Sequence, residues 1–142
     1  MKPFKGSRWT HIFQKQAYKS WCGFAYETIC LKHIHKIKIA LKCEQIESKN
    51  YSWHNKNALV DLVINRNDGV VNLCEIKFYN YEFSIDANYL KQLRNKENQF
   101  RKTTKTKKGI YTAMITTWGI KSNQYSQAIV TNSLTMNSLF EK

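Results

Sequence analysis

Two apolar runs joined by a short turn constrain the fold of this chain more than any other feature. The runs read ALVDLVIN from residue 58 and VVNLCEIKFY from residue 70, and the sequence RNDG separates them at residues 66–69. β-Branched residues are frequent in both runs, and Asp-Gly is a typical hairpin sequence. Because both runs are apolar on both faces, we expect two adjacent strands in a sheet that is covered on each side.

Three charged residues interrupt these runs. Asp61 lies in the first run, and Glu75 and Lys77 lie two residues apart in the second. Since strand side chains alternate between faces, we expect Glu75 and Lys77 on one face. The same alternation predicts that Leu59, Asp61 and Val63 share a face of the first strand. A carboxylate in an apolar run is costly unless it is paired or binds a cation.

The pattern therefore favours a site for a divalent ion. Mg²⁺ commonly binds through one or two carboxylates plus substrate phosphate. Asp61 and Glu75 can supply the carboxylates if the two strands diverge near Asp61. The bound ion then lowers the pKa of a water and neutralises charge on a phosphate, which is the chemistry of phosphodiester hydrolysis. Lys77 can orient the water, stabilise developing charge or act as a base, and the sequence does not choose between these roles.

An ordinary structural role for these residues stays open. Glu75 and Lys77 can form a charge pair on an exposed strand, and Asp61 can accept backbone hydrogen bonds in a turn. The bare pattern of Asp followed by Glu-x-Lys is common. In this chain the metal-site interpretation of the pattern is favoured by the apolar residues around it and by the turn that aligns the two strands. A third carboxylate, Glu27, interrupts the apolar stripe of an expected helix and favours it further.

The remaining pattern predicts one α/β domain over residues 1–142, with a central mixed β-sheet flanked by helices. Residues 1–8 are expected to be a flexible N-terminus. The other expected elements are a helix over 18–42, an extended segment over 44–54, a helix over 86–100, a strand from 109, a strand over 127–132 and a terminal anchor over 138–140.

The charge balance points to a polyanionic partner. Lys and Arg outnumber Asp and Glu by 23 to 10, which gives a formal charge of +13. Nucleic acid is the first expectation, with DNA favoured, and a solvated basic face is the alternative. Eight basic residues are expected to contact phosphates: Lys91, Arg94, Lys96, Arg101, Lys102, Lys105, Lys107 and Lys108. Trp53 is a candidate for stacking on bases, whereas Trp21 and Trp118 are expected in the core or at caps.

Membrane and secretion signals are weak in this sequence. No segment approaches about 18 uninterrupted apolar residues, and the first residues contain no apolar signal core. The four cysteines include no C-x-x-C pair. We therefore expect no membrane association and a reducing, cytoplasmic location.

The placement of Glu27, Asp61 and Glu75-x-Lys77 resembles the PD-(D/E)XK nuclease superfamily. Longer runs, such as LCEIKF and TTWGI, resemble the nuclease-like C-terminal domain of AAA-type ATPases of the kind common in Bacteroidetes. The resemblance covers the chain from about residue 9 to 140. Two features depart from it: Ser138 stands where relatives usually have an acidic residue, and the G-x-x-x-x-G-K-[ST] motif of the ATPase module is absent.

This resemblance implies a restriction-endonuclease-like fold and a DNA endonuclease activity that depends on Mg²⁺ or Mn²⁺. It assigns Asp61, Glu75 and Lys77 as the catalytic motif, with Glu27 as the helix acid that can add to the metal shell, often through water. Gln92 and Lys96 are candidates to line the site. An AAA-type ATPase module is an implied partner, and a homodimer stays open. The alternatives are a non-catalytic module that binds nucleic acid or docks on an ATPase, and a ribonuclease.

Overall fold

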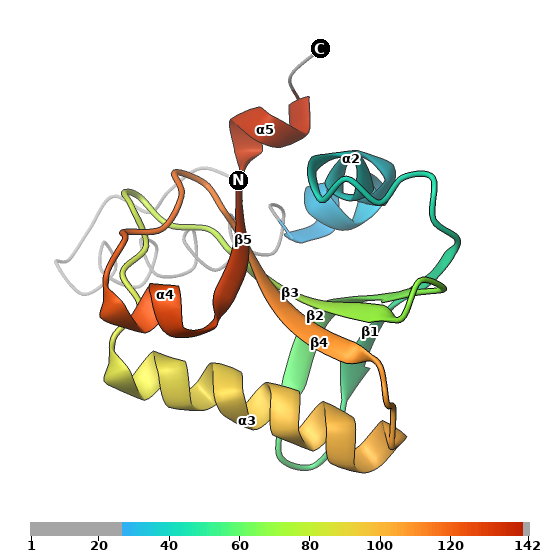
Figure 1. Cartoon of the computed structure of the whole chain (residues 1–142). Helices are drawn as coiled ribbons and strands as arrows, with labels where there is room; N and C mark the ends of the chain where they lie inside the picture. The colour runs from blue at the N-terminus through green and yellow to red at the C-terminus, as the bar shows by residue number, and fades with distance from the viewer. Residues whose placement is uncertain (1–26, 141–142) are drawn as a thin grey trace, which may run out of the picture.

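The computed structural model describes residues 27–140 of this chain and contains one five-stranded mixed β-sheet. The strands are β1 (Ser48–His54), β2 (Leu59–Arg66), β3 (Val70–Lys77), β4 (Gly109–Thr116) and β5 (Val130–Thr135). They follow the order β1-β2-β3-β4-β5 across the sheet (Figure 1). Neighbours are antiparallel from β1 to β3 and parallel from β3 to β5. The predicted hairpin and the predicted mixed sheet are both confirmed.

Helices cover both faces of the sheet. The named helices are α2 (Ile34–Ala40), α3 (Ala87–Thr104), α4 (Gln124–Ile129) and α5 (Met136–Phe140), and residues 27–32 are also helical. Helices α2 and α5 lie on one face, while α3 and α4 lie on the opposite face (Figure 1). Within the described part of the chain, no helix has the length and apolar character needed to cross a membrane.

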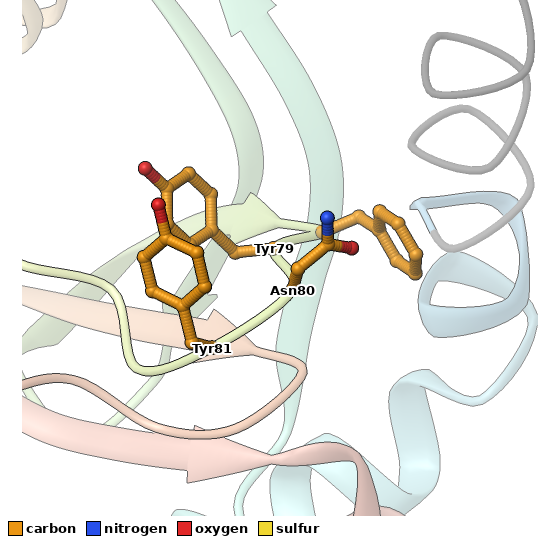
Figure 2. A pocket seen from close by; sticks show the side chains of 4 residues that line it. Tyr79, Asn80 and Tyr81 are labelled. Carbon is orange, nitrogen blue, oxygen red and sulfur yellow. The ribbon is translucent and has the colours of Figure 1, made fainter. Parts of the chain in front are cut away.

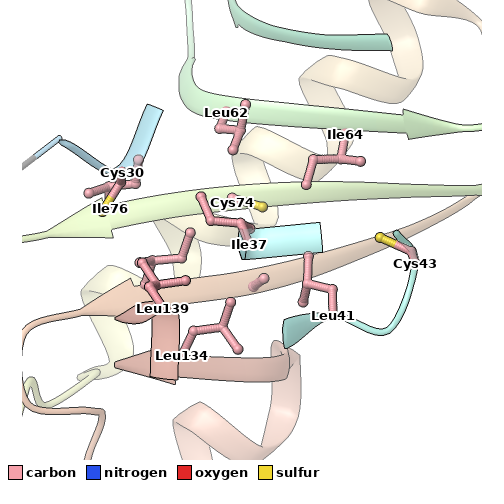
Figure 3. Close-up of a cluster of buried hydrophobic side chains, with 12 residues drawn as sticks. Cys30, Ile37, Leu41, Cys43, Leu62, Ile64, Cys74, Ile76, Leu134 and Leu139 are labelled. Carbon is pink, nitrogen blue, oxygen red and sulfur yellow. The ribbon is translucent and has the colours of Figure 1, made fainter. Parts of the chain in front are cut away.

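The apolar stripe of the first helical region packs on the sheet as its spacing predicts. Cys30, Ile37 and Leu41 are buried in one cluster with residues of the strands and with Leu139 of α5 (Figure 3). The helix is not continuous, because His33 lies in a turn between residues 27–32 and α2. The Leu139 contact also confirms the predicted role of the final segment as an anchor.

Helix α3 forms the core on the opposite face. The Asp86 side chain caps its start by accepting a hydrogen bond of 2.7 Å from the Tyr89 backbone N–H. Leu93 and Phe100 are each 1 % exposed and face the sheet. The helix continues to Thr104 and ends where Lys105 adopts a left-handed conformation with φ 56°. It therefore ends four residues later than the sequence predicts.

The predicted last strand over residues 127–132 is wrong at its start. Residues 124–129 form α4, and β5 begins only at Val130. Asn123 explains the difference, since its side chain accepts hydrogen bonds from the backbone N–H groups of Tyr125 and Ser126. Ser126 in turn accepts a hydrogen bond from the Asn123 backbone N–H, which completes a capping box that starts a helix.

Several expectations fall on residues outside the described range. These are the flexible N-terminus over 1–8, the beginning of the first helix over 18–26, and the core or cap role of Trp21. They stay predictions.

Ile37→Ala is expected to destabilise the domain strongly. Ile37 is completely buried in the cluster beneath α2, so truncation leaves a cavity. We expect the free energy of unfolding to fall by about 2–5 kcal/mol. Ile39, on the same helix, is 47 % exposed and provides a matched control. Urea denaturation should show a much smaller loss for Ile39→Ala, and equal losses would contradict the packing described here.

Candidate active site

Strands β2 and β3 separate at the two predicted acidic residues. Their pairing runs from Asn65 opposite Val71 to Leu62 opposite Cys74, and Asp61 and Glu75 lie just beyond this last pair. The Asp61 Oδ2 atom accepts a hydrogen bond of 2.8 Å from the Ile76 backbone N–H. Glu75 Oε2 accepts a weaker one of 3.4 Å from the Asp61 backbone N–H. Each carboxylate therefore binds the backbone of the opposite strand where the ladder has ended.

A β-bulge changes the faces of β2 near Asp61. The register between β1 and β2 shifts between Tyr51 and Trp53, where Tyr51 is opposite Val63 and Trp53 is opposite Val60. Val60 and Val63 consequently pack in one cluster, although strict alternation would put them on opposite faces. Leu59 is 56 % exposed. The prediction that Leu59, Asp61 and Val63 share one face is therefore wrong.

Glu75 is the most deeply buried acidic residue among those described, with 2 % of its surface exposed. Burial, together with the negative charge of Asp61, raises the pKa of Glu75 to about 7, and Lys96 opposes this rise. Two carboxylates that repel one another in a dry environment are stabilised by any cation that binds between them. The site is therefore electrostatically suited to a positive ion.

Lys96 of α3 already supplies one positive charge. Its ammonium forms an ion pair with Glu75 Oε1, and this ion pair is partly buried. Lys96 lies three residues after Leu93 and four before Phe100, on the helix face that contacts the sheet. The structure therefore places Lys96 at the site. Gln92, the other predicted lining residue of this helix, is exposed.

Lys77 lies on the same face as Glu75, next to Tyr89 of α3. The Lys77 Nζ atom is 5.6 Å from the centre of the Tyr89 ring. Burial and the charges of Glu75 and Asp61 raise the pKa of Tyr89. Its hydroxyl is buried and has no hydrogen-bond partner among the described residues. Tyr89 was not predicted as a site residue; its position seven residues before Lys96, about two helical turns, is the signal that connects it to this site.

Glu27 reaches this region from the helical residues on the opposite face of the sheet. Burial raises its pKa, the negative charge of Asp61 adds to the rise, and Lys77 opposes it. Glu27 is thus close enough to interact with both residues. Within residues 27–140, however, no three His, Cys, Asp or Glu side chains form a group that could hold a metal ion. A contact of Glu27 with a bound ion, often through water, stays a prediction.

The basic residues predicted to bind phosphates fall into two groups. Three have partners within the protein: Lys96 binds Glu75, Arg101 donates to the carbonyls of Thr106 and Lys108, and Lys108 donates to Asn65 and to the Arg66 carbonyl. The remaining five are exposed: Lys91, Arg94, Lys102, Lys105 and Lys107. Arg101 therefore holds the segment that follows α3, and Lys108 joins that segment to the end of β2. Contact with phosphates stays a prediction for the whole set.

The two described tryptophans lie in different environments. The Trp53 ring packs edge-on against Phe100, with ring centres 5.2 Å apart and an interplanar angle of 75°. Trp53 therefore packs against the core beneath α3, and its stacking on bases stays a prediction. Trp118 is 60 % exposed, so the expectation of a buried or capping residue is wrong for it.

A pocket of about 250 Å³ lies directly after Lys77. The residues that line it are Phe78, Tyr79, Asn80 and Tyr81 (Figure 2). Tyr79 and Tyr81 extend side by side with their hydroxyl groups in the same direction, and the Tyr81 hydroxyl raises the pKa of Tyr79. This segment was not predicted from the sequence, although two tyrosines stand there directly after the Glu-x-Lys strand.

The raised pKa of Glu75 predicts a pH-dependent stability. Between pH 4.5 and about 7, the Glu75 carboxyl keeps its proton in the folded protein, because its pKa there is about 7. In the unfolded chain its pKa has the ordinary value of 4.5, so the same carboxyl is ionised in this range. Stability from this group is therefore present at low pH and is lost as pH rises through that window. We expect wild type to lose about 3 kcal/mol more than Glu75→Gln across the window. Urea denaturation in EDTA measures this, and parallel curves for the two proteins would contradict it.

The arrangement brings two carboxylates, two lysines and a buried tyrosine hydroxyl to one end of β3. Glu27 acts on it electrostatically. No protein-family model, curated protein or solved structure matches this chain.

Proposed function

We propose that this domain hydrolyses phosphodiester bonds of DNA with the help of Mg²⁺ or Mn²⁺. The observation that carries the proposal is the meeting of Asp61 and Glu75 where β2 and β3 separate, with Lys77 two residues after Glu75. The formal charge of +13 supports a polyanionic substrate.

The donor set fits a hard divalent cation. Asp61 and Glu75 offer carboxylate oxygens, and Mg²⁺ commonly uses one or two such groups and completes its shell with water and phosphate. One Asp61 oxygen is fixed by the Ile76 N–H, which orients the carboxylate. A bound ion supplies charge neutralisation at the phosphate and a more acidic water. We infer that Asp61 and Glu75 hold it, and that Glu27 contributes through water.

Three further residues of the site have separate roles in the proposed reaction. Lys77 is half-buried, and its ammonium is available to donate a hydrogen bond to a phosphate oxygen or to the attacking water. Lys96 neutralises Glu75 in the protein as described, so its ammonium is expected to move from Glu75 Oε1 when a cation binds there. The half-buried Tyr89 ring beneath Lys77 limits where the lysine can point.

The order of elements supports a restriction-endonuclease-like version of this α/β fold. A helical region precedes three antiparallel strands, and a long helix then leads to a parallel strand. We further propose that the domain works in a reducing, cytoplasmic environment, since Cys43 and Cys74 are buried thiols that form no disulfide with any described residue. Association with an AAA-type ATPase is also a proposal, and it rests on the sequence resemblance.

A nicking assay tests the proposal. Purified protein is incubated with supercoiled plasmid in Mn²⁺, in Mg²⁺ and in EDTA. We expect relaxed plasmid with either metal and none in EDTA, and loss of nicking in Asp61→Asn. Plasmid binding that weakens with salt, without nicking in any metal, would contradict hydrolysis and support a binding module instead.

A further inference from the structure

Large aromatic side chains are exposed where β3 and β4 end. Tyr81 is 66 % exposed, Trp118 is 60 % exposed and Tyr79 is 38 % exposed. Tyr79 and Tyr81 follow β3, and Trp118 follows the parallel strand β4. All three therefore lie at the same end of the sheet, where these strands finish. Exposed aromatic surface that folding does not bury commonly marks an interaction site.

Backbone contacts hold the two segments together. The Tyr79 N–H donates to Thr117 Oγ1 at 3.2 Å. Further along, the Phe83 N–H donates to the Gly119 carbonyl at 2.9 Å, and Phe83 and Ile120 form a parallel bridge. Tyr81 and Trp118 lie between these contacts along their segments. Their side chains are therefore presented by neighbouring stretches of backbone.

The tyrosines are also held in position by other rings. Tyr79 packs edge-on against Tyr81, with ring centres 4.8 Å apart and an interplanar angle of 78° (Figure 2). It packs against Phe83 in the same manner, with ring centres 5.4 Å apart. Stacking on a ring that is already fixed costs less conformational entropy than stacking on a free side chain. Asn80 adds an amide to the adjoining pocket.

These rings lead directly to the candidate active site. Phe83 packs against Tyr89 with ring centres 5.1 Å apart, and Lys77 lies over the Tyr89 ring. Lys77 is also only two residues from Tyr79 along the chain. A ligand that covers Tyr79 and Tyr81 would therefore continue towards Lys77 and Glu75.

We propose that Tyr79, Tyr81 and Trp118 stack on unpaired bases, so that the preferred substrate is a single strand or an unpaired segment. The choice of nucleic acid rests on the proposed function and on the formal charge of +13, which complements a polyanion. Bases inside a duplex cover one another's faces, whereas an unpaired base has a free face for an aromatic ring. Because every base has such a face, the contact is independent of sequence.

Binding without metal tests this inference separately from cleavage. Fluorescence anisotropy in EDTA compares a labelled single strand of about 16 nucleotides with a duplex of equal length. We expect wild type to prefer the single strand. Tyr81→Ala and Trp118→Ala should each weaken single-strand binding by about tenfold and leave duplex binding unchanged.

Two controls separate stacking from other effects. Tyr81→Phe keeps the ring and should bind single strands within about twofold of wild type. Tyr111, which is 44 % exposed near the beginning of β4, offers a tyrosine at the far end of that strand, and Tyr111→Ala should also bind normally. A single strand without bases should bind wild type more weakly than the normal strand binds Tyr81→Ala, because it loses the contacts with all three rings.

The outcomes distinguish this inference from the proposed function. Equal affinity for single strand and duplex, or alanine variants that bind like wild type, would overturn the stacking inference even if the plasmid is nicked. Tight binding of the strand without bases would do the same. If single-strand binding depends on Tyr81 but no metal supports cleavage, the stacking inference stands and the proposed hydrolysis falls.

Discussion

Glu75→Gln is expected to lower metal-dependent plasmid nicking by about a thousandfold, which corresponds to about 4 kcal/mol of transition-state stabilisation. Glutamine has nearly the same shape and can still accept a hydrogen bond from the Asp61 N–H. It carries no charge, however, so it cannot balance a divalent ion. Because the side chain is buried between β2 and α3, the substitution changes charge with little change in packing.

A metal-binding readout separates this effect from misfolding. Mn²⁺ should raise the Tm of wild type, since a ligand that binds only the folded state stabilises it. The same addition should leave the Tm of Glu75→Gln unchanged. Glu44→Gln removes an exposed carboxylate and should behave like wild type in both measurements. A Glu75→Gln protein that nicks plasmid normally would exclude this carboxylate from the reaction.

Lys77→Met is expected to lower nicking by about 10²–10³-fold while preserving metal binding. Methionine keeps an unbranched apolar stem next to Tyr89 but removes the ammonium. The carboxylates of Asp61 and Glu75 remain, so the Mn²⁺-dependent rise in Tm should persist. The nicking rate and the Tm shift are measured on the same preparation.

An exposed lysine of α3 serves as the control for Lys77. Lys91→Met removes a positive charge of the predicted phosphate-binding set. It should weaken DNA binding modestly, and lower salt should restore the loss. If Lys77→Met behaves in the same way, or if it loses the Tm shift as well, Lys77 acts through general charge or folding and not at the reacting phosphate.

The sequence predicts those parts of the fold that depend on local patterns. Asp68 and Gly69 specify the turn between β2 and β3, and Gly69 adopts the positive φ of 86° that favours glycine. The apolar runs on either side then become paired strands. Helix α3 begins at the Asp86 cap, close to its predicted start. These features need only neighbouring residues to form.

Features that depend on tertiary contacts were missed or placed wrongly. The bulge opposite Tyr51 and Trp53 depends on the pairing of β1 with β2, and no local motif in either strand predicts it. The pairing of Lys96 with Glu75 joins residues 21 positions apart through packing of α3 on the sheet. The exposure of Trp118 likewise follows from which segments lie beside it. Periodicity alone cannot supply these distances.

The turn at residues 66–69 has a consequence for how this chain tolerates change. Asp61 and Glu75 meet because the ladder from Asn65–Val71 to Leu62–Cys74 fixes the two strands in one register. Shifting a strand by one residue turns its side chains to the opposite face. Insertions or deletions in that short connection would thus separate the two acids, whereas exchanges among turn-compatible residues would leave them together. Loop length, more than loop composition, is under constraint here.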